Sequence, residues 1–386
     1  MTAKDLPSHA DVVVIGGGVM GVSTAYHLAK AGVTDVVLVE KDALGSGSTC
    51  KAAGGVRAQF SDEVNIQLGA RSLETFANFE QIFGQQIDLH RVGYLFLLDS
   101  AEAVETFERN VALQNDLGVP TRMIDVDEAK KLSSYISTDG LVGAAFGPDD
   151  GHCTPESVVL GYASAARRLG VRIVTSCAAT GIDIDDGQVR AVRTEAGRIE
   201  CETVVCATGA WSREIGEWAG VDLPVTPIRR QILISEPVAD LPPDIPFTID
   251  FATSFYFHGE GNGLLMGMSD PDETPGFKLS QGEDWLPRLG EAIERRAPAL
   301  SDIGLASGWA GLYEMTPDHN GLIGEAEGVS RFLYATGFSG HGFLMGPAVG
   351  EVMRDIYLGN RPFVDVGGLD AARFAGAALR PETNIV

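Results

Sequence analysis

The apolar positions at the start of the chain change their spacing twice within about thirty residues. Residues 11–15 (DVVVI) form a short apolar run, which predicts a buried parallel strand. Residues 22–30 then carry apolar or small side chains at helical spacing, and residues 36–40 (VVLVE) form a second apolar run. A glycine-rich segment, 16–21 (GGGVMG), separates the first run from the helix. Strand, glycine turn, helix, strand and terminal acid predict one right-handed βαβ unit.

Two later segments follow the same pattern of a strand that ends in a glycine turn. Residues 198–207 are predicted to form a strand followed by TGAW, and residues 332–335 a strand followed by TGFSGHG. Pro347 is expected to open a helix that runs to about Tyr357. These strands and the first one are expected to lie in one parallel sheet.

The stretches between these segments differ in their polar pattern. Residues 93–99 are predicted to form a strand of mixed burial, and residues 101–114 a polar helix. Residues 227–237 and 255–268 are expected to form strands of a second sheet. The chain is therefore predicted to be an α/β protein, with a discontinuous Rossmann-like dinucleotide-binding domain and an inserted β-rich α+β domain.

Composition and charge exclude several classes of function. The 386 residues allow two or three domains of about 150 residues each. A net charge of −24 excludes a nucleic-acid footprint and disfavours binding to an anionic membrane surface. No apolar run approaches the ~20 residues of a membrane span, and the first residues lack the apolar core of a signal peptide. Five scattered cysteines without a CxxC motif indicate neither a disulfide framework nor a metal site, so a cytoplasmic location is expected.

The glycine turn predicts a site for a dinucleotide. Gly16, Gly18 and Gly21 match GxGxxG, in which the glycines allow a tight turn, close approach of a pyrophosphate and close packing of helix on strand. The helix N-terminus offers free N–H groups and a partial positive charge to the phosphates. Glu40, at the end of the second strand, can accept hydrogen bonds from ribose hydroxyls and would repel a 2′-phosphate.

Small residues after Glu40 favour a flavin over a nicotinamide. Residues 45–49 (GSGST) and 52–55 (AAGG) let the backbone run close to a bulky flat ring. The 337–342 loop leads into a helix whose N-terminus can face the pyrimidine edge of a flavin and stabilise the charge of its reduced form. A nicotinamide-dependent dehydrogenase is the alternative, but it gives neither segment a role.

The motifs resemble those of the D-amino-acid oxidase superfamily of flavoproteins, and most of all the group of sarcosine oxidase and proline dehydrogenase beta-subunits. The matching stretches are DVVVIGGGVMGVSTAYHLAKAG, GSGSTCKAAGGVRAQF, VVCATGAWS, WAGLYEMTPDHNGLIG and YATGFSGHGFLMGPAVGEV. The resemblance implies FAD as cofactor, an amine substrate and hydride transfer to flavin N5. It implies an FAD-binding domain of residues 1–92, 149–224 and 311–386 and a substrate-binding domain of residues 93–148 and 225–310.

Many residues of these motifs are expected to contact FAD. They are Gly16, Gly18, Val19, Met20, Gly21, Glu40, Lys41, Gly47, Ser48, Thr49, Gly54, Gly55, Ala179, Thr208, Gly209, Trp211, Gly311, Gly337, Phe338, Ser339, Gly340, His341, Gly342 and Phe343. His341 has two open interpretations, because it can donate to the flavin carbonyl edge or brace the loop.

Oxidation of an amino acid requires a carboxylate anchor and a neutral amine whose lone pair can form the imine. Arg57 is the expected anchor, since it follows the flavin-facing loop and its guanidinium suits a carboxylate. It matches an arginine that binds the substrate carboxylate in sarcosine oxidases. The alternative is a surface arginine paired with Asp62 or Glu63.

Three further residues are candidates for the substrate pocket. Tyr256 and His258 lie on one face of a predicted strand and Phe255 on the other, and the family's tyrosine aligns with Tyr256 or with Phe255. Tyr313 stands where glycine and D-amino-acid oxidases carry an arginine, which argues against those enzymes.

Departures from the family pattern limit these expectations. Gly311 stands where monomeric sarcosine oxidases attach flavin through cysteine, and Cys50-Lys51 where dimethylglycine enzymes use histidine, so FAD is predicted to be non-covalent. Leu265 and Leu344 replace two family lysines, one that activates dioxygen and one that binds carboxylate. Their loss weakens the case for dioxygen as acceptor and for sarcosine as substrate, and it suits a bulkier amine such as proline.

The expected function is an FAD-dependent oxidoreductase that oxidises a secondary amino acid, N-methylated or cyclic, such as sarcosine or proline. The resulting imine then hydrolyses. A glycine or D-amino-acid oxidase is one alternative, and a non-catalytic flavin-binding assembly factor is another. The expected partners are a small amine substrate and, by the resemblance, a partner subunit or an electron-transfer protein.

Overall fold

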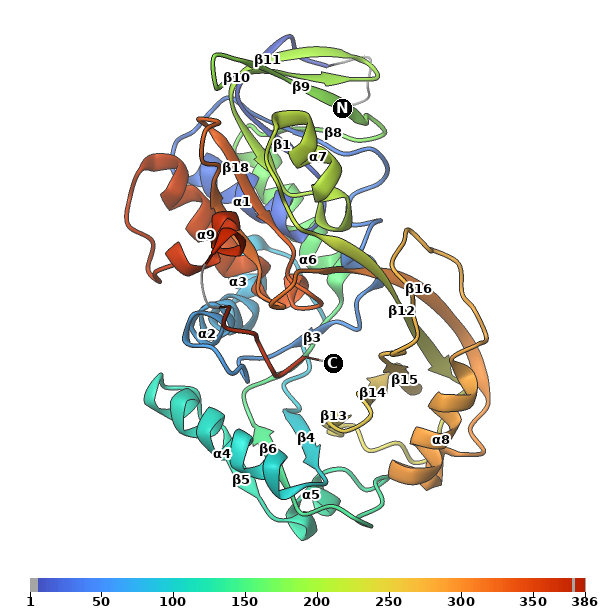
Figure 1. Cartoon of the computed structure of the whole chain (residues 1–386). Helices are drawn as coiled ribbons and strands as arrows, with labels where there is room; N and C mark the ends of the chain where they lie inside the picture. Colours follow the sequence, from blue (N-terminus) through green and yellow to red (C-terminus); the bar gives the residue numbers. More distant parts are fainter. Residues whose placement is uncertain (1–5, 377–378, 386) are drawn as a thin grey trace.

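The computed structural model describes residues 6–376 and 379–385, which form two large sheets with helices around them (Figure 1). The first sheet has the order β17-β18-β11-β1-β2-β8, and every neighbouring pair is parallel except β17 with β18. Its strands are β1 (His9–Ile15), β2 (Val36–Val39), β8 (Arg172–Val174), β11 (Gly197–Cys206), β17 (Leu322–Glu325) and β18 (Phe332–Thr336). The predicted parallel sheet is thus confirmed.

Both faces of the first sheet are buried, which explains its continuous apolar strands. Two antiparallel strands that pair onward from β11 cover one face together with α7, and a group of five helices covers the opposite face. The first group is β9 (Ala179–Asp185), β10 (Gln188–Thr194) and α7 (Ser212–Ala219). The second is α1 (Val19–Lys30), α2 (Glu63–Ala77), α3 (Phe79–Phe83), α6 (Pro155–Arg168) and α9 (Gly342–Leu358).

Helix α9 begins at Gly342, and the prediction that Pro347 opens it is wrong. Pro347 lies in the second turn, where its missing N–H costs one hydrogen bond to the carbonyl four residues earlier. Close packing against α1 offsets that cost, because a side chain at Gly346 or Gly350 would collide with α1. The earlier start places the first turn of α9 directly after the 337–342 loop.

The second sheet has the order β16-β12-β15-β14-β13-β4-β6-β5, with only β13 and β4 parallel. Its strands are β4 (Tyr94–Leu98), β5 (Arg122–Ile124), β6 (Gly143–Gly147), β12 (Thr226–Ser235), β13 (Phe247–Asp250), β14 (Phe255–Glu260), β15 (Gly263–Met268) and β16 (Leu305–Met315). Helices α4 (Ala101–Asp116), α5 (Val126–Leu132) and α8 (Leu286–Arg296) accompany it. β4 is buried throughout, not of mixed burial as predicted, because its two faces enter two different cores.

Two long strands connect the halves of the molecule. In Figure 1, β12 and β16 lead from the upper part, which holds the first sheet, into the lower part. The predicted domain boundary between residues 310 and 311 falls inside β16, and the division into domains stays a prediction. A small third sheet of β3 (Gly55–Val56) and β7 (Gly151–His152) lies where the chain crosses between the two large ones.

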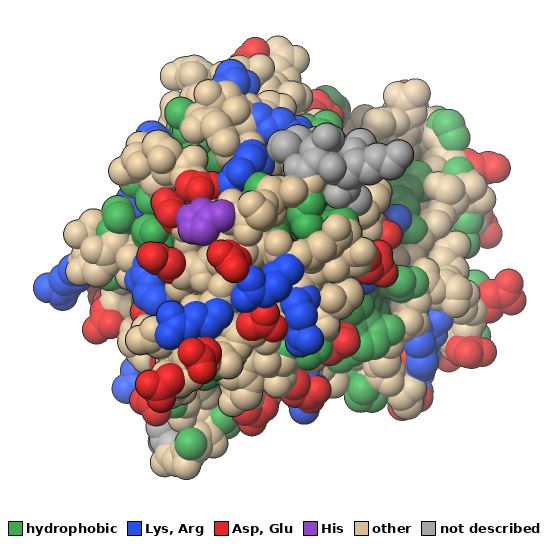
Figure 2. Space-filling model, turned by 90° about the horizontal axis from the view of Figure 1, so that it is seen from above, with side chains coloured by type: hydrophobic (Ala, Val, Ile, Leu, Met, Phe, Trp, Pro, Cys, Tyr) green, Lys and Arg blue, Asp and Glu red, His purple; other side chains and the backbone are tan. Residues whose placement is uncertain are grey.

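The surface seen in Figure 2 carries positive and negative side chains mixed together. On β9–β11, for example, Arg198 bridges Asp183 and Glu200 at 2.8 and 2.9 Å. Among the residues that the structure describes, no helix is long and apolar enough to cross a membrane.

The tightest contact in the βαβ unit gives a test of the fold. A Cβ at Gly21 would collide with the Gly16 carbonyl oxygen, so Gly21→Ala should force α1 away from β1. We expect a loss of about 1–3 kcal/mol in the free energy of unfolding, with reduced flavin content, measured by chemical denaturation and absorbance. Gly290→Ala in α8, where a Cβ meets no atom within 4 Å, is the control and should leave stability unchanged or slightly raised. Equal effects of the two changes would contradict the packing argument.

Candidate active site

One elongated cavity of about 500 Å³ lies between the two sheets and gathers most of the residues predicted from the sequence. The predicted cofactor residues that line it are Gly16, Gly18, Val19, Met20, Glu40, Lys41, Gly47, Ser48, Thr49, Gly54, Gly55, Ala179, Thr208, Gly209, Trp211, Gly311, Gly340, His341, Gly342 and Phe343. The predicted catalytic residues that line it are Arg57, Tyr256, Tyr313 and His341. Gly21, Gly337, Phe338, Ser339 and His258 do not line it, contrary to expectation.

The glycine turn forms one end of the cavity. A side chain at Gly16 would collide with the Ala207 carbonyl, so the turn is pressed against the end of β11. Gly21 does not line the cavity, but its lack of a side chain lets α1 pack directly on this turn. The Val19 amide donates to the Thr49 hydroxyl at 3.2 Å, and the other first-turn N–H groups of α1 have no partner within the helix. This end therefore presents the anion-binding geometry of a helix N-terminus.

Glu40 is held in place beside the glycine turn. One carboxylate oxygen accepts from the Gly17 amide at 2.7 Å and the other from the Asp42 amide at 2.8 Å. Each oxygen keeps a further lone pair toward the cavity, which suits two ribose hydroxyls. Next to it, the Lys41 ammonium lies 3.7 Å from the centre of the Trp211 ring.

The loop at the other end of the cavity is fixed by buried polar contacts. Glu314 accepts from the Gly337 amide at 3.0 Å and from the Thr336 hydroxyl at 3.1 Å. Ser339 has a left-handed backbone (φ 50°), and its amide donates to the Glu314 carbonyl at 3.1 Å. Phe338 is buried in the core behind the loop. These three loop residues, Gly337 to Ser339, thus shape the wall without lining it, while Gly340 to Gly342 face the cavity.

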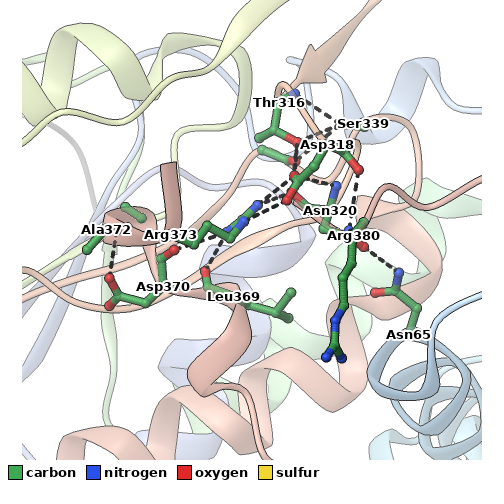
Figure 3. Close-up of polar contacts among 12 residues, drawn as sticks. Asn65, Thr316, Asp318, Asn320, Ser339, Leu369, Asp370, Ala372, Arg373 and Arg380 are labelled. Atoms are coloured by element: carbon green, nitrogen blue, oxygen red, sulfur yellow. Dashed lines mark hydrogen bonds and ion pairs between the residues drawn. The ribbon is translucent and has the colours of Figure 1, made fainter. Parts of the chain in front are cut away.

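A second layer of contacts supports this loop from outside (Figure 3). The Thr316 amide donates to the Ser339 hydroxyl at 3.1 Å. Asp318 accepts two hydrogen bonds from Arg373, at 2.8 and 2.9 Å, in a bidentate pair. The turn after β16 and the segment around Arg373 therefore hold the loop that precedes α9.

The second sheet presents an aromatic face to the cavity. Tyr94 stacks on Phe247 with ring centres 4.2 Å apart, and Phe247 lies 5.4 Å from Tyr256. Phe255 points into the opposite core, so of the two candidate positions only Tyr256 lines the cavity. Tyr313 completes this face from β16.

His258 lies on the same face as Tyr256 but beyond the cavity. Its Nε2 is 3.0 Å from the Ala53 carbonyl oxygen and its Nδ1 2.8 Å from that of Gly259. Phe247 covers its ring at 4.7 Å, and burial lowers its pKa to about 4. The expectation that His258 lines the substrate pocket is therefore wrong. His258 lies two residues beyond Tyr256 on β14, and its side chain contacts the backbone at Ala53 instead of the cavity.

Arg57 is buried, with 2% of its surface exposed, so the alternative of a surface arginine is wrong. Its guanidinium lies 4.2 Å from the Phe60 ring and donates to the carbonyl oxygens of Gln59 and Asn384. Burial lowers its pKa, yet a guanidinium stays charged at any physiological pH. It therefore brings a fixed positive charge to the cavity.

His341 caps α9 next to Arg57. Its ring meets Phe60 edge-on at 5.0 Å. Burial, and then the charge of Arg57, lower its pKa well below the usual value, so the imidazole is neutral at pH 7. A neutral ring has one donor and one acceptor nitrogen, which fits a hydrogen bond to a carbonyl edge better than acid catalysis.

The sequence interpretation missed several residues of the cavity. Arg230 and Ile232 of β12 and Tyr94 of β4 were assigned only as strand residues, and Phe247, in β13, was given no assignment. The arginine pair 229–230 inside an apolar strand is the one signal that could have pointed to this wall.

A parallel sheet with a glycine turn, an acid after the second strand and a second helix N-terminus at the same cavity define a dinucleotide-dependent oxidoreductase fold. Residues 11–356 match the family model described as FAD dependent oxidoreductase (DAO). The chain belongs to this family, and the resemblance drawn from the motifs is confirmed.

Relatives and solved structures agree with this assignment. The chain is 30% identical to 4-methylaminobutanoate oxidase (formaldehyde-forming) of Paenarthrobacter nicotinovorans, over 96% of this chain and 46% of the relative. It is 30% identical to mitochondrial dimethylglycine dehydrogenase of Rattus norvegicus, over 95% and 45%. It thus spans less than half of either relative. The crystal structure of L-proline dehydrogenase from P. horikoshii superposes with a TM-score of 0.92 at 34% identity, covering 97% of this chain and 100% of that one.

The cavity fits the family's cofactor. The α1 N-terminus offers N–H groups for a pyrophosphate, and Glu40 offers acceptors for a ribose. At the far end, the first turn of α9 at Gly342 and the neutral His341 offer donors for the carbonyl edge of a flavin. The glycines at 47, 54 and 55 line the cavity and contribute no side chain to its wall.

Buried Asp150 lies next to Arg57 and accepts from the Ala58 amide at 3.0 Å. Its carboxyl group gives a pH test of the structure around Arg57. Burial raises its pKa from 3.8 to about 7, so the native state binds its proton more tightly than the unfolded chain. Its stabilising contribution is therefore complete below about pH 4 and disappears as the pH rises through about 7. We expect urea midpoints of Asp150→Asn to fall less than those of the wild type between pH 4 and pH 7. Asp302→Asn, at an exposed position, should follow the wild type; parallel curves for all three proteins would contradict the prediction.

Proposed function

We propose that the protein is an FAD-dependent oxidoreductase that oxidises a secondary amino acid, N-methylated or cyclic, to an imine. The observation that carries this proposal is the position of Arg57 and the aromatic face in the same cavity as both helix N-termini. The proposal takes further support from relatives named as a methylaminobutanoate oxidase, a dimethylglycine dehydrogenase and an L-proline dehydrogenase.

In this proposal Arg57 binds the substrate carboxylate, and Tyr94, Phe247 and Tyr256 form an apolar floor that excludes water. Bound FAD supplies the acceptor for the hydride that leaves the substrate C–H bond, while the nitrogen lone pair forms the C=N bond. The positive charge of Arg57 disfavours a protonated amine beside it, which keeps the lone pair available. Neutral His341 accepts or donates one hydrogen bond without adding a second charge.

Tyr313 separates this proposal from a glycine or D-amino-acid oxidase. In the resemblance, those enzymes bind carboxylate with an arginine at this position, whereas Tyr313 offers a phenol whose pKa is raised by burial. A non-catalytic flavin-binding role is the alternative that substrate reduction tests directly. Transfer of electrons to a partner subunit or an electron-transfer protein, and a cytoplasmic location, stay predictions.

The proposal is tested by anaerobic reduction of the purified flavoprotein with sarcosine, proline and hydroxyproline. We expect flavin absorbance near about 450 nm to bleach with at least one secondary amine. Arg57→Met should keep its flavin but bind that substrate about 10- to 100-fold more weakly, because a charge-assisted bidentate contact is lost. Arg190→Met, at an exposed position on β10, is the matched control. No bleaching across the amines would favour the non-catalytic role, and unchanged kinetics of Arg57→Met would remove Arg57 from the substrate.

We also propose that FAD is bound without a covalent link. Gly311 has no side chain to offer, and a Cβ there would approach the Lys51 side chain at 2.6 Å. Cys50 is a poor nucleophile, because burial and then Glu156 raise the pKa of its thiol to about 12.

Acid precipitation tests the non-covalent link. We expect trichloroacetic acid to leave all flavin in the supernatant, measured by absorbance against the total before precipitation. Flavin that stays with the washed pellet would contradict the proposal.

A further inference from the structure

Arg230 brings a second guanidinium cation to the cavity. It lies on β12 opposite Gly311 of β16, and its guanidinium is 5.0 Å from the centre of the Tyr313 ring. One hydrogen bond goes to a backbone oxygen, from Nη1 to the Arg229 carbonyl at 3.0 Å. Its Nε is buried and has no hydrogen-bond partner, and no ion pair with an acid is found for it within the described part of the chain.

The neighbouring Arg229 shows how a structural arginine on this strand is paired with an acid. Arg229 points to the other side of β12, where its Nε donates to Glu273 at 2.6 Å and its Nη1 to the Ser280 carbonyl at 3.0 Å. The chain has 53 acidic residues against 29 basic ones, so acids for pairing are plentiful. A buried charge without a partner costs free energy, and a buried unsatisfied donor in a native site calls for an explanation. An anionic group bound in the cavity against this guanidinium would give the charge a partner.

The phosphates of the cofactor are not the expected partner of Arg230. Their predicted cradle is the first turn of α1 at Val19, which belongs to the first sheet. Arg230 belongs to the second sheet and lies on its cavity face together with Tyr256 and Tyr313. Arg230 thus lines the same wall as the aromatic residues assigned above to the substrate.

Arg57 and Arg230 make separate contacts on the same cavity. Arg57 lies near the rings of Phe60 and Phe96 and donates to two backbone carbonyls, whereas Arg230 lies against Tyr313. Tyr313 is within electrostatic range of both guanidinium groups. Two fixed cations on one substrate cavity match a ligand with two anionic groups.

We propose that Arg230 is a second anion-binding residue and that the preferred substrates are secondary amino acids with a second carboxylate. This inference rests on the proposed function, in which Arg57 holds the first carboxylate. Arg230 then sets specificity: it selects the acidic side chain or N-substituent without contacting the bond that is oxidised.

The test compares isosteric acids and amides, so that only the second charge differs. N-methylaspartate is compared with N-methylasparagine, and N-methylglutamate with N-methylglutamine, each in both enantiomers, by anaerobic reduction of the flavoprotein. We expect one acid to reduce the wild type about 10- to 100-fold more efficiently than its amide, measured as the rate constant of flavin reduction divided by the substrate Kd. Arg230→Met should abolish that preference by weakening the acid and sparing the amide, while Arg190→Met retains it. Arg230→Lys keeps the charge and should retain part of the preference for the acid. It is the variant to measure if Arg230→Met does not fold.

Binding without turnover separates this inference from the proposed function. Succinate and glutarate are titrated against their monoamides by calorimetry, with flavin content checked in every variant. Tighter binding of a dicarboxylate to the wild type, lost in Arg230→Met, would support the anion site even if no amine reduces the flavin. The inference is overturned if the wild type treats acids and amides alike, or if Arg230→Met weakens both to the same extent.

Discussion

The contact between α1 and the turn before it is the constraint on which the rest of the site depends. Gly21 allows the helix to rest directly on the Gly16 carbonyl, which aims the first turn of α1 along the cavity. Helix α9 packs on α1 through Gly346 and Gly350, so its own N-terminus opens at the other end of the same cavity. Two helix N-termini in one elongated space suit a ligand with phosphates at one end and a charge-accepting ring at the other.

The four central strands of the first sheet, β18, β11, β1 and β2, were predictable from the sequence, because their signals are local, whereas β8, β9, β10 and β17 were not assigned. Apolar runs such as 11–15 and 36–40 are buried on both sides and leave little ambiguity. The start of α9 was not predictable in the same way. A glycine at 342 is typical of a loop and a proline at 347 is typical of a first turn, yet the helix that packs against α1 begins at Gly342 and continues through Pro347.

The same distinction between local signals and tertiary packing applies to the residues of the candidate site. The glycines of the first turn and Glu40 can be recognised from the sequence alone, because the turn requires glycines and Glu40 stands at the end of a strand. The substrate side depends on which face of a strand looks inward and how far along the strand the cavity extends. Tyr256 and His258 share a face, but only Tyr256 reaches the cavity. Nothing in the sequence of β12 indicates that Arg230 lies against Tyr313 of β16. Such facts follow from the pairing of distant strands, which spacing alone does not fix.

The split of the cavity between two sheets has an evolutionary consequence. Side chains around the ribose and phosphates come from the first sheet, whereas Tyr94, Arg230, Phe247 and Tyr256 come from the second. Under the proposed function, substitutions on the second sheet alter which amines are accepted and leave the residues expected to hold the cofactor unchanged. Such a layout lets specificity diverge within a lineage one amino-acid replacement at a time.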